Sequence, residues 1–208
     1  MKTITTTLYQ YDEASEELKE KIIEKHWDIN VDYPGWSDFI LDYFKEELDR
    51  AGIDNPEILY SGFYSQGDGL SFTSRWINLE KLMEYTHANE RYPGIFQALK
   101  DGRLDYSCYI ERTRGYHYVH GRSATLIIDS VDNLYDDEKD EEAHFTLENI
   151  LNEELDDLKD YLNQWREDTC SDFYYKLEKE FEYLCSDEAV IETIQANEYY
   201  FDDEGNIR

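Results

Sequence analysis

The chain has 208 residues, with 49 Asp and Glu against 20 Lys and Arg, and its formal net charge at pH 7 is −29. Such an excess argues against direct binding to nucleic acid or to anionic membranes, because like charges repel, and it makes a basic protein the expected partner. High net charge alone would favour disorder, but 15% of the residues are aromatic, so we expect one folded domain over residues 1–208, with two small lobes that share a core as the alternative.

The first quarter of the sequence predicts a strand followed by two helices. Residues 3–11 are rich in β-branched and aromatic side chains, which is typical of a strand. Ser15 is followed by two glutamates, so we expect a helix that its side chain caps. Residues 36–48 carry apolar side chains three and four positions apart, and Gly52 follows them, so they predict the clearest helix.

The middle of the chain predicts two hairpins separated by short helices. The β-prone runs 58–64 and 70–76 form the first, and 104–111 and 116–130 form the second, with its turn at 112–115. Between them, Asn78 can cap one short helix, and another is expected to end at Gly102. The expected fold class is α+β, an antiparallel sheet built from hairpins and packed against several helices.

Residues 132–142 have too few apolar side chains to pack, so we expect an exposed acidic loop there. The C-terminal part, about 145–195, is expected to be helical because apolar residues recur at helical spacing: Leu147, Leu151, Leu155, Leu158, Leu162 and Trp165. The pattern fits one long acidic helix or a pair joined near residues 168 and 169, and the stripe can fill a monomer core or form a homodimer seam. Residues 198–201 predict a last strand that pairs with the main sheet.

The acidic residues of this C-terminal part are the predicted partner-binding surface. Carboxylates three or four residues apart on a helix lie about 5–6 Å from one another, and such a row can imitate the regular charge of DNA. The alternatives are that the acidic face serves only solubility or reflects a halophilic origin. The predicted contact residues are Asp136, Asp137, Glu138, Asp140, Glu141, Glu142, Glu148, Glu153, Glu154, Asp156, Asp157 and Asp160.

A glycine-rich segment in the first hairpin is the second candidate site. It contains Gln66, Gly67, Asp68 and Gly69, and three glycines within residues 62–69 permit unusual backbone conformations or close approach to a ligand. It lacks the lysine and spacing of a phosphate-binding loop. A tight hairpin that satisfies its own polar groups is the alternative to a ligand site completed by His117 and Tyr118.

Other kinds of site find little support. His117 and His120 would point to opposite faces of a strand, and no calcium-loop or hydrolase motif is present, so we expect no metal, no cofactor and no catalytic residues. Cys108 is expected to be a core residue. Three cysteines without a CxxC pair favour a reducing compartment. The N-terminal residues lack the apolar region of a signal peptide, and no apolar segment is long enough to span a membrane. We therefore expect a cytoplasmic protein.

Three segments together resemble a known family. They are YDEASEELKEKIIE at 11–24, SGFYSQGDGLSF at 61–72 and IQANEYYFDDEGNI at 194–207. In these motifs the sequence resembles a family of uncharacterised acidic proteins of bacteriophages and prophages, whose members share SGFxSQGDGxSF. The resemblance implies a phage accessory protein in a host bacterial cytoplasm, where inhibitors of restriction and CRISPR systems are common and several mimic DNA.

Charge and resemblance together predict a non-enzymatic, phage-encoded anti-defence inhibitor. It would bind the basic, nucleic-acid-binding surface of a host protein, such as a CRISPR or restriction complex, by electrostatic DNA mimicry. One alternative is a small enzyme or ligand-binding domain that uses the glycine-rich segment. Another is a phage structural or assembly protein whose charge serves solubility.

Overall fold

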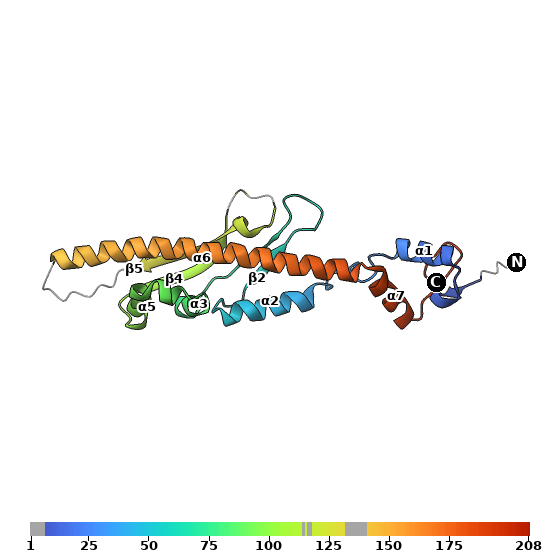
Figure 1. The fold of residues 1–208 in the computed structure, drawn as a ribbon, viewed down its shortest axis with the longest axis horizontal. Coiled ribbons are helices and arrows are strands. Elements are labelled where there is room, and N and C mark those ends of the chain that lie inside the picture. Colours follow the sequence, from blue (N-terminus) through green and yellow to red (C-terminus); the bar gives the residue numbers. More distant parts are fainter. Residues whose placement is uncertain (1–6, 114, 116–117, 132–140) are drawn as a thin grey trace. The chain divides into compact units, whose positions relative to one another are not determined.

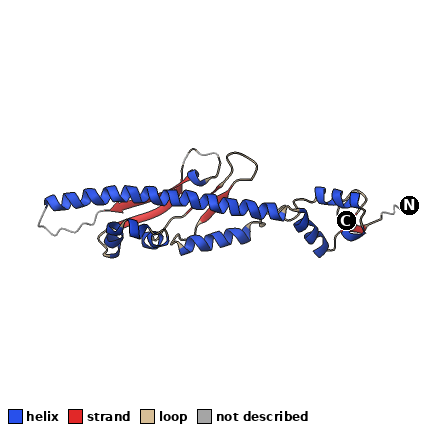
Figure 2. Ribbon diagram, viewed as in Figure 1, coloured by secondary structure: helices blue, strands red, loops and turns tan. Residues whose placement is uncertain are grey.

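A computed structural model describes residues 7–113, 115, 118–131 and 141–208. The chain divides into two compact units, which we call unit 1 (Met1–Phe39 with Lys176–Arg208) and unit 2 (Ile40–Tyr175). Helices and three two-stranded antiparallel sheets make up the described residues, which confirms the predicted α+β class (Figures 1 and 2). The single domain expected over residues 1–208 stays a prediction, since compact units can still fold cooperatively.

Unit 1 consists of short elements around a small apolar core. Its elements are strand β1 (Tyr9–Gln10), the 3₁₀ helix η1 (Tyr11–Glu13), helices α1 (Glu16–Lys25) and α7 (Asp187–Ala196), and strand β6 (Tyr200–Phe201). The Ser15 hydroxyl accepts a hydrogen bond from the Leu18 N–H at 3.3 Å, which confirms the predicted cap of α1. Ile22, Val190 and Phe201 are fully buried between these elements.

The ends of the chain pair with each other in unit 1. Tyr9 lies opposite Phe201 and Gln10 opposite Tyr200 in an antiparallel register. The prediction that the last strand joins the main sheet was therefore wrong. The apolar Phe201 side chain packs into the unit 1 core beside Ile22, and this burial determines its pairing with β1.

Unit 2 contains both predicted hairpins. The first is β2 (Glu57–Tyr60) with β3 (Leu70–Thr73), and the second is β4 (Asp105–Arg112) with β5 (Ala124–Val131). Ser74 and Ile110 exchange two backbone hydrogen bonds of 3.1 and 2.8 Å and so join β3 to β4.

The turn of the second hairpin is longer than predicted. The strand ends at Arg112 and its partner begins at Ala124, so the connection is 113–123 and not 112–115. The 3₁₀ helix η2 (Gly121–Ser123) lies in this connection, and the buried Arg166 guanidinium donates a hydrogen bond to the Gly121 carbonyl. This contact joins η2 to the helix that carries Arg166.

Four shorter helices belong wholly or mainly to unit 2: α2 (Asp38–Arg50), α3 (Leu79–Tyr85), α4 (Ala88–Arg91) and α5 (Pro93–Lys100). Asn78 caps α3 as predicted, because its side chain accepts from the Lys81 N–H at 3.0 Å. Gly52 follows α2 with φ +86°, a conformation that glycine adopts without strain. The apolar stripe of α2 is narrower than expected, since Phe44 is fully buried while Phe39 is 90% exposed.

Helix α6 (Glu141–Leu184) is a single helix of 44 residues. It continues through residues 168 and 169, where the Thr169 hydroxyl donates to the Trp165 carbonyl at 2.8 Å, a bond that helical backbone accommodates. The break before α7 occurs instead at Cys185, and Ser186 caps the new helix. Residues 132–140 of the predicted acidic loop lie outside the described residues, whereas Glu141 and Glu142 form the start of α6.

No helix within the described parts of the chain combines the length and the apolar character needed to cross a bilayer.

The stacked pair Phe44 and Phe173 is predicted to be a main contributor to the stability of unit 2. Both rings are fully buried and stack with centroids 4.2 Å apart. Phe173→Ala should lower the free energy of unfolding by about 3–5 kcal/mol, because it removes buried apolar area and leaves a cavity. Urea denaturation followed by circular dichroism measures the change. The matched control is Phe39→Ala, where the ring is 90% exposed and little should change; equal losses in the two variants would contradict the assignment.

Asp202 is predicted to stabilise unit 1 in a pH-dependent way. Its carboxylate accepts hydrogen bonds from the Asn206 backbone and side chain and pairs with Arg208 at 2.6 Å, and these contacts hold the pKa of Asp202 well below its usual value. A lowered pKa stabilises the fold above the unfolded pKa of about 4 and loses that contribution as the pH falls. Asp202→Asn should therefore lower the urea midpoint at pH 7, and the gap from wild type should close in acid. The exposed Asp203→Asn is the control, and a gap independent of pH would refute the role.

Candidate functional site

Four aspartates lie in a row along the outer face of α6, and we call them the α6 acidic row: Asp157, Asp160, Asp168 and Asp172. All four are exposed, and Gln164 occupies the position between Asp160 and Asp168. Side chains three and four residues apart on a helix are surface neighbours at about 5–6 Å, so Asp157 lies beside Asp160 and Asp168 beside Asp172. Gln164 separates these two pairs by about 12 Å along the helix. No basic side chain among the described residues forms an ion pair with Asp157 or Asp160.

The rotation of α6 about its axis is fixed by contacts with the rest of unit 2. The Asn163 side chain accepts from the Leu126 N–H at 2.9 Å and donates to the Leu126 carbonyl at 3.0 Å. The Tyr161 hydroxyl donates to the Thr86 carbonyl at 2.7 Å. Leu158 and Leu162 are fully buried, whereas Tyr161 follows Asp157 by four residues and lies in the same stripe as the row. These contacts leave the four aspartates exposed.

The described part of the predicted partner-binding set agrees in part with this row. Asp156, Asp157 and Asp160 are exposed, and Asp156 pairs with Lys159 at 3.1 Å, whereas Glu154 is only partly exposed. For four residues the structure describes the backbone of α6 but not the side chain: Glu141, Glu142, Glu148 and Glu153. Four others lie outside the described residues: Asp136, Asp137, Glu138 and Asp140.

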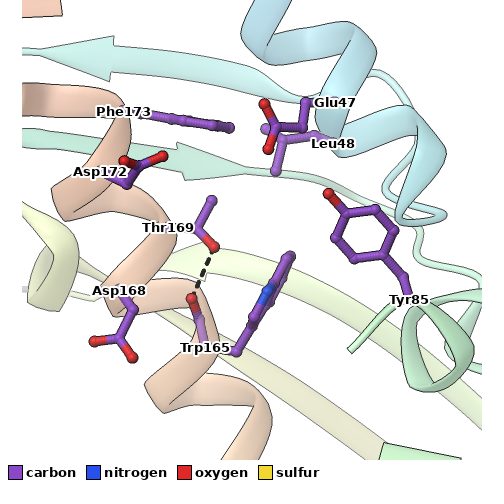
Figure 3. Close-up of a pocket in the computed structure, with 8 residues that line it drawn as sticks. All are labelled: Glu47, Leu48, Tyr85, Trp165, Asp168, Thr169, Asp172 and Phe173. Atoms are coloured by element: carbon purple, nitrogen blue, oxygen red, sulfur yellow. Dashed lines mark hydrogen bonds between the residues drawn. The ribbon is translucent and has the colours of Figure 1, made fainter. Parts of the chain in front are cut away.

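The acidic row ends at a pocket of about 170 Å³ that the sequence did not reveal (Figure 3). Residues of α2 and α3 lie on one side of it, and α6 residues form the other. Its lining consists of Glu47, Leu48, Tyr85, Trp165, Asp168, Thr169, Asp172 and Phe173. Only the α6 share of this lining has a sequence signal, since residues 165, 168, 169 and 172 recur at helical spacing on one face.

The pocket combines aromatic rings with carboxylates. The rings of Tyr85 and Trp165 meet edge to face, with centroids 6.1 Å apart and an interplanar angle of 77°. Asp168 and Asp172 are exposed at its margin, while Oε2 of Glu47 is buried and accepts no hydrogen bond from any described residue. The pocket therefore has an anionic, partly desolvated interior, which suits a cation.

The glycine-rich segment satisfies most of its polar groups within the hairpin. The Asp68 carboxylate accepts from the N–H groups of Tyr64 and Ser65 at 3.0 and 2.7 Å. The Ser61 hydroxyl donates to the Val119 carbonyl at 3.1 Å and accepts from the Gly69 N–H at 3.2 Å. These contacts agree with the alternative interpretation of the sequence, a tight hairpin that satisfies its own polar groups.

Of the remaining residues of that candidate site, the structure brings Gly67 and Tyr118 together. Gln66 is exposed, and Gly67 packs so closely on Tyr118 that a Cβ atom would lie 2.7 Å from its ring. His117 lies outside the described residues, and Nδ1 of His120 accepts from the Arg122 N–H at 3.1 Å. A small cavity beside Ser71 is lined by Leu59, Thr73, Arg112, Val119, Ser123 and Ala124, and not by residues 61–69 or Tyr118.

Burial makes two of the thiols unreactive. It raises the pKa of Cys108 to about 12 and that of Cys170 to about 11, so both are protonated at neutral pH. Among the residues with described side chains, no group of three or more His, Cys, Asp or Glu residues is arranged to hold a metal ion. The acidic pocket is included in that statement, so its carboxylates are too dispersed to chelate one.

Comparison with known proteins places the chain in a family. A family model described as a domain of unknown function (DUF8835) matches residues 36–187, and the chain therefore belongs to this family. The matched region contains all of unit 2, including the α6 acidic row, the pocket and the glycine-rich segment. No curated protein and no solved structure shows a significant match to the chain.

The close approach of Gly69 to the second hairpin predicts a structural role for this glycine. A Cβ atom here would lie 2.8 and 2.9 Å from Cβ and Cα of His120, which are fixed by the backbone. Gly69→Ala should therefore lower the free energy of unfolding by about 1–3 kcal/mol through overpacking. The control in the same loop is Gly62→Ala, whose Cβ would meet only Asp68 Oδ2 at an ordinary 3.5 Å. Equal urea midpoints for the two variants would show that the segment tolerates a side chain at both positions.

Proposed function

We propose that this member of the DUF8835 family is a non-enzymatic inhibitor that binds the basic, nucleic-acid-binding surface of another protein and thereby excludes its nucleic acid. The observation that carries the proposal is the α6 acidic row, a line of exposed carboxylates on a rigid helix whose orientation is fixed by buried contacts. The net charge of −29 also favours a positively charged partner.

The length of the row supports recognition by a groove that binds a phosphate backbone. From Asp157 to Asp172 the helix rises about 22 Å, at about 1.5 Å per residue. The charges along it are sparser than those of one DNA strand, which carries a charge about every 3.4 Å. They follow one another at uneven steps of three, eight and four residues, but a groove lined with Lys and Arg attracts any such line of negative charge.

The resemblance to acidic phage and prophage proteins supplies the biological setting of the proposal. A phage protein of this kind would act in the cytoplasm of the host bacterium, and the basic partner would be a DNA-binding defence protein such as a restriction or CRISPR complex. Carboxylates on a preformed helix suit such a role, because little conformational entropy is lost when the complex forms.

Neutralising part of the acidic row should weaken inhibition. The double variant Asp157→Asn/Asp160→Asn removes two exposed carboxylates that have no ion pair with a described basic residue. We expect about tenfold weaker displacement of a labelled DNA duplex from a restriction endonuclease or a CRISPR effector complex, measured by fluorescence anisotropy. For the wild type, displacement should weaken steeply between about 50 and 200 mM salt.

The matched control removes the same charge from unit 1. Glu16 and Glu17 are exposed on α1 and pair with Lys19 and Lys21, so Glu16→Gln/Glu17→Gln changes the net charge equally without touching the row. If both double variants lose the same amount of activity, general charge and not the row is responsible. Absence of displacement at low salt across both classes of DNA-binding protein would refute the proposed function.

A further inference from the structure

We propose that the pocket between α2, α3 and α6 binds the guanidinium group of an arginine side chain presented by the partner. The inference rests on the proposed function, which supplies a basic partner. It adds one specific contact to that function. The pocket lies at the end of the α6 acidic row, since Asp168 and Asp172 belong to both. An arginine on the partner's surface would therefore reach it from the same face.

The first argument is the charge of the pocket. Acidic residues of two helices line it, Glu47 from α2 and Asp168 with Asp172 from α6, and the Asp168 carboxylate points outward at the margin (Figure 3). Asp168 is partly engaged, because its Oδ1 accepts from the Gln164 side chain at 2.9 Å. No basic side chain is among the residues that line the pocket. The described carboxylates do not form a metal-binding cluster, so an organic cation with several donors suits the site better than a metal ion.

The second argument is the state of Glu47. Its Oε2 atom is buried and has no hydrogen-bond partner among the described residues. A carboxylate oxygen that is removed from water without a donor is costly, because its hydration is lost and not replaced. Because Glu47 lines the pocket, a guanidinium bound there would offer donors to this carboxylate.

The third argument is the aromatic lining. Tyr85 and Trp165 present rings in an edge-to-face arrangement, so the face of one ring and the edge of the other border the same space. A guanidinium plane over an aromatic face gains a cation–π attraction of about 0.5–2 kcal/mol, and tryptophan is the best partner for it. The aliphatic stem of an arginine would contact Leu48, which also lines the pocket.

Size and geometry favour arginine over other cations. At about 170 Å³ the pocket is smaller than the roughly 300–1,000 Å³ of pockets that enclose whole small-molecule ligands, so it suits a single side chain. Its carboxylates lie on different sides of that space (Figure 3). The planar guanidinium has five donors that point outward in a fixed fork, whereas the lysine ammonium is a compact point charge.

The test uses N-acetyl-L-arginine amide as the probe and the full-length protein. The indole N–H resonance of Trp165, assigned with a Trp165→Phe variant, is followed by NMR during titration. We expect a saturable shift with arginine amide and an affinity at least about tenfold lower for the citrulline analogue, which has nearly the same shape but no charge. Equal shifts with both probes, or no saturable shift of Trp165 with arginine amide, would overturn the proposal.

Two variants separate the pocket from the surrounding charge. Glu47→Gln preserves the shape of the side chain and should lower the affinity for arginine amide by about tenfold or more. Asp157→Asn removes the same charge from α6 outside the pocket and should change the affinity by less than about threefold. As a second readout, arginine amide should raise the melting temperature of the wild type but not of Glu47→Gln, because only a ligand that binds the folded state stabilises it. Equal affinities for the two variants would refute a specific pocket.

Failure of this inference can be distinguished from failure of the proposed function. If Glu47→Gln displaces DNA from the target as well as wild type does and arginine amide does not bind, the row acts without the pocket. If arginine amide binds at Trp165 but the protein displaces no DNA, the pocket serves a basic partner that does not bind nucleic acid.

Discussion

Unit 2 depends on the asymmetry of α6, which is apolar along one side and acidic along the other. The buried side contributes Leu158, Leu162 and Phe173, all fully buried, and each such side chain stabilises the fold by about 1.5–3 kcal/mol relative to an exposed position. Because residues of one helix share a rigid frame, the burial that stabilises the unit also determines where the carboxylates point. The acidic row is thus a consequence of the same contacts that hold the fold together.

Arg166 shows how this helix organises the polar parts of the unit. It is only 1% exposed although it lies on a helix with many solvated acids, and burial lowers its pKa. Its guanidinium donates to the Gly121 carbonyl and lies near Glu167 at 3.7 Å and Asn163 at 3.4 Å. A buried charge is tolerated only when it is paired and hydrogen-bonded. Arg166 therefore links the long turn of the second hairpin to α6. Its charge alone would have placed this side chain at the surface.

Local chemistry was predictable from the sequence, and long-range packing was not. The caps at Ser15 and Asn78, the glycine after α2 and the two hairpins follow from interactions between residues close in sequence. The pairing of β1 with β6 depends on burial of Phe201 beside residues nearly 200 positions away, which no local pattern contains. The continuation of α6 past Thr169 could not be decided either, because the apolar period is the same for one helix as for two.

The same difference between local and long-range features applies to the candidate site. The outward position of Asp156, Asp157 and Asp160 was predictable, because helical spacing opposite a leucine stripe determines it. The pocket was not predictable, since Glu47 and Tyr85 reach it from elements that only the tertiary fold brings to α6. Neither residue stands out in sequence, where Glu47 is one of many acids and Tyr85 one of 19 tyrosines.

In the proposed complex the row and the pocket would act over different ranges. Exposed carboxylates such as Asp157 act through solvent, where charges are screened beyond about 8–10 Å at moderate salt, so they mainly raise the rate of encounter with a basic surface. A guanidinium held between Glu47 and Trp165 would be largely desolvated, and its contribution would persist at salt concentrations that screen the row. A line of charge fits many basic grooves in several registers, whereas a pocket that takes one side chain fixes a single register. Selectivity among basic proteins would therefore come from the position of one arginine relative to the groove, and the large net charge would bring candidates close enough to be tested against it.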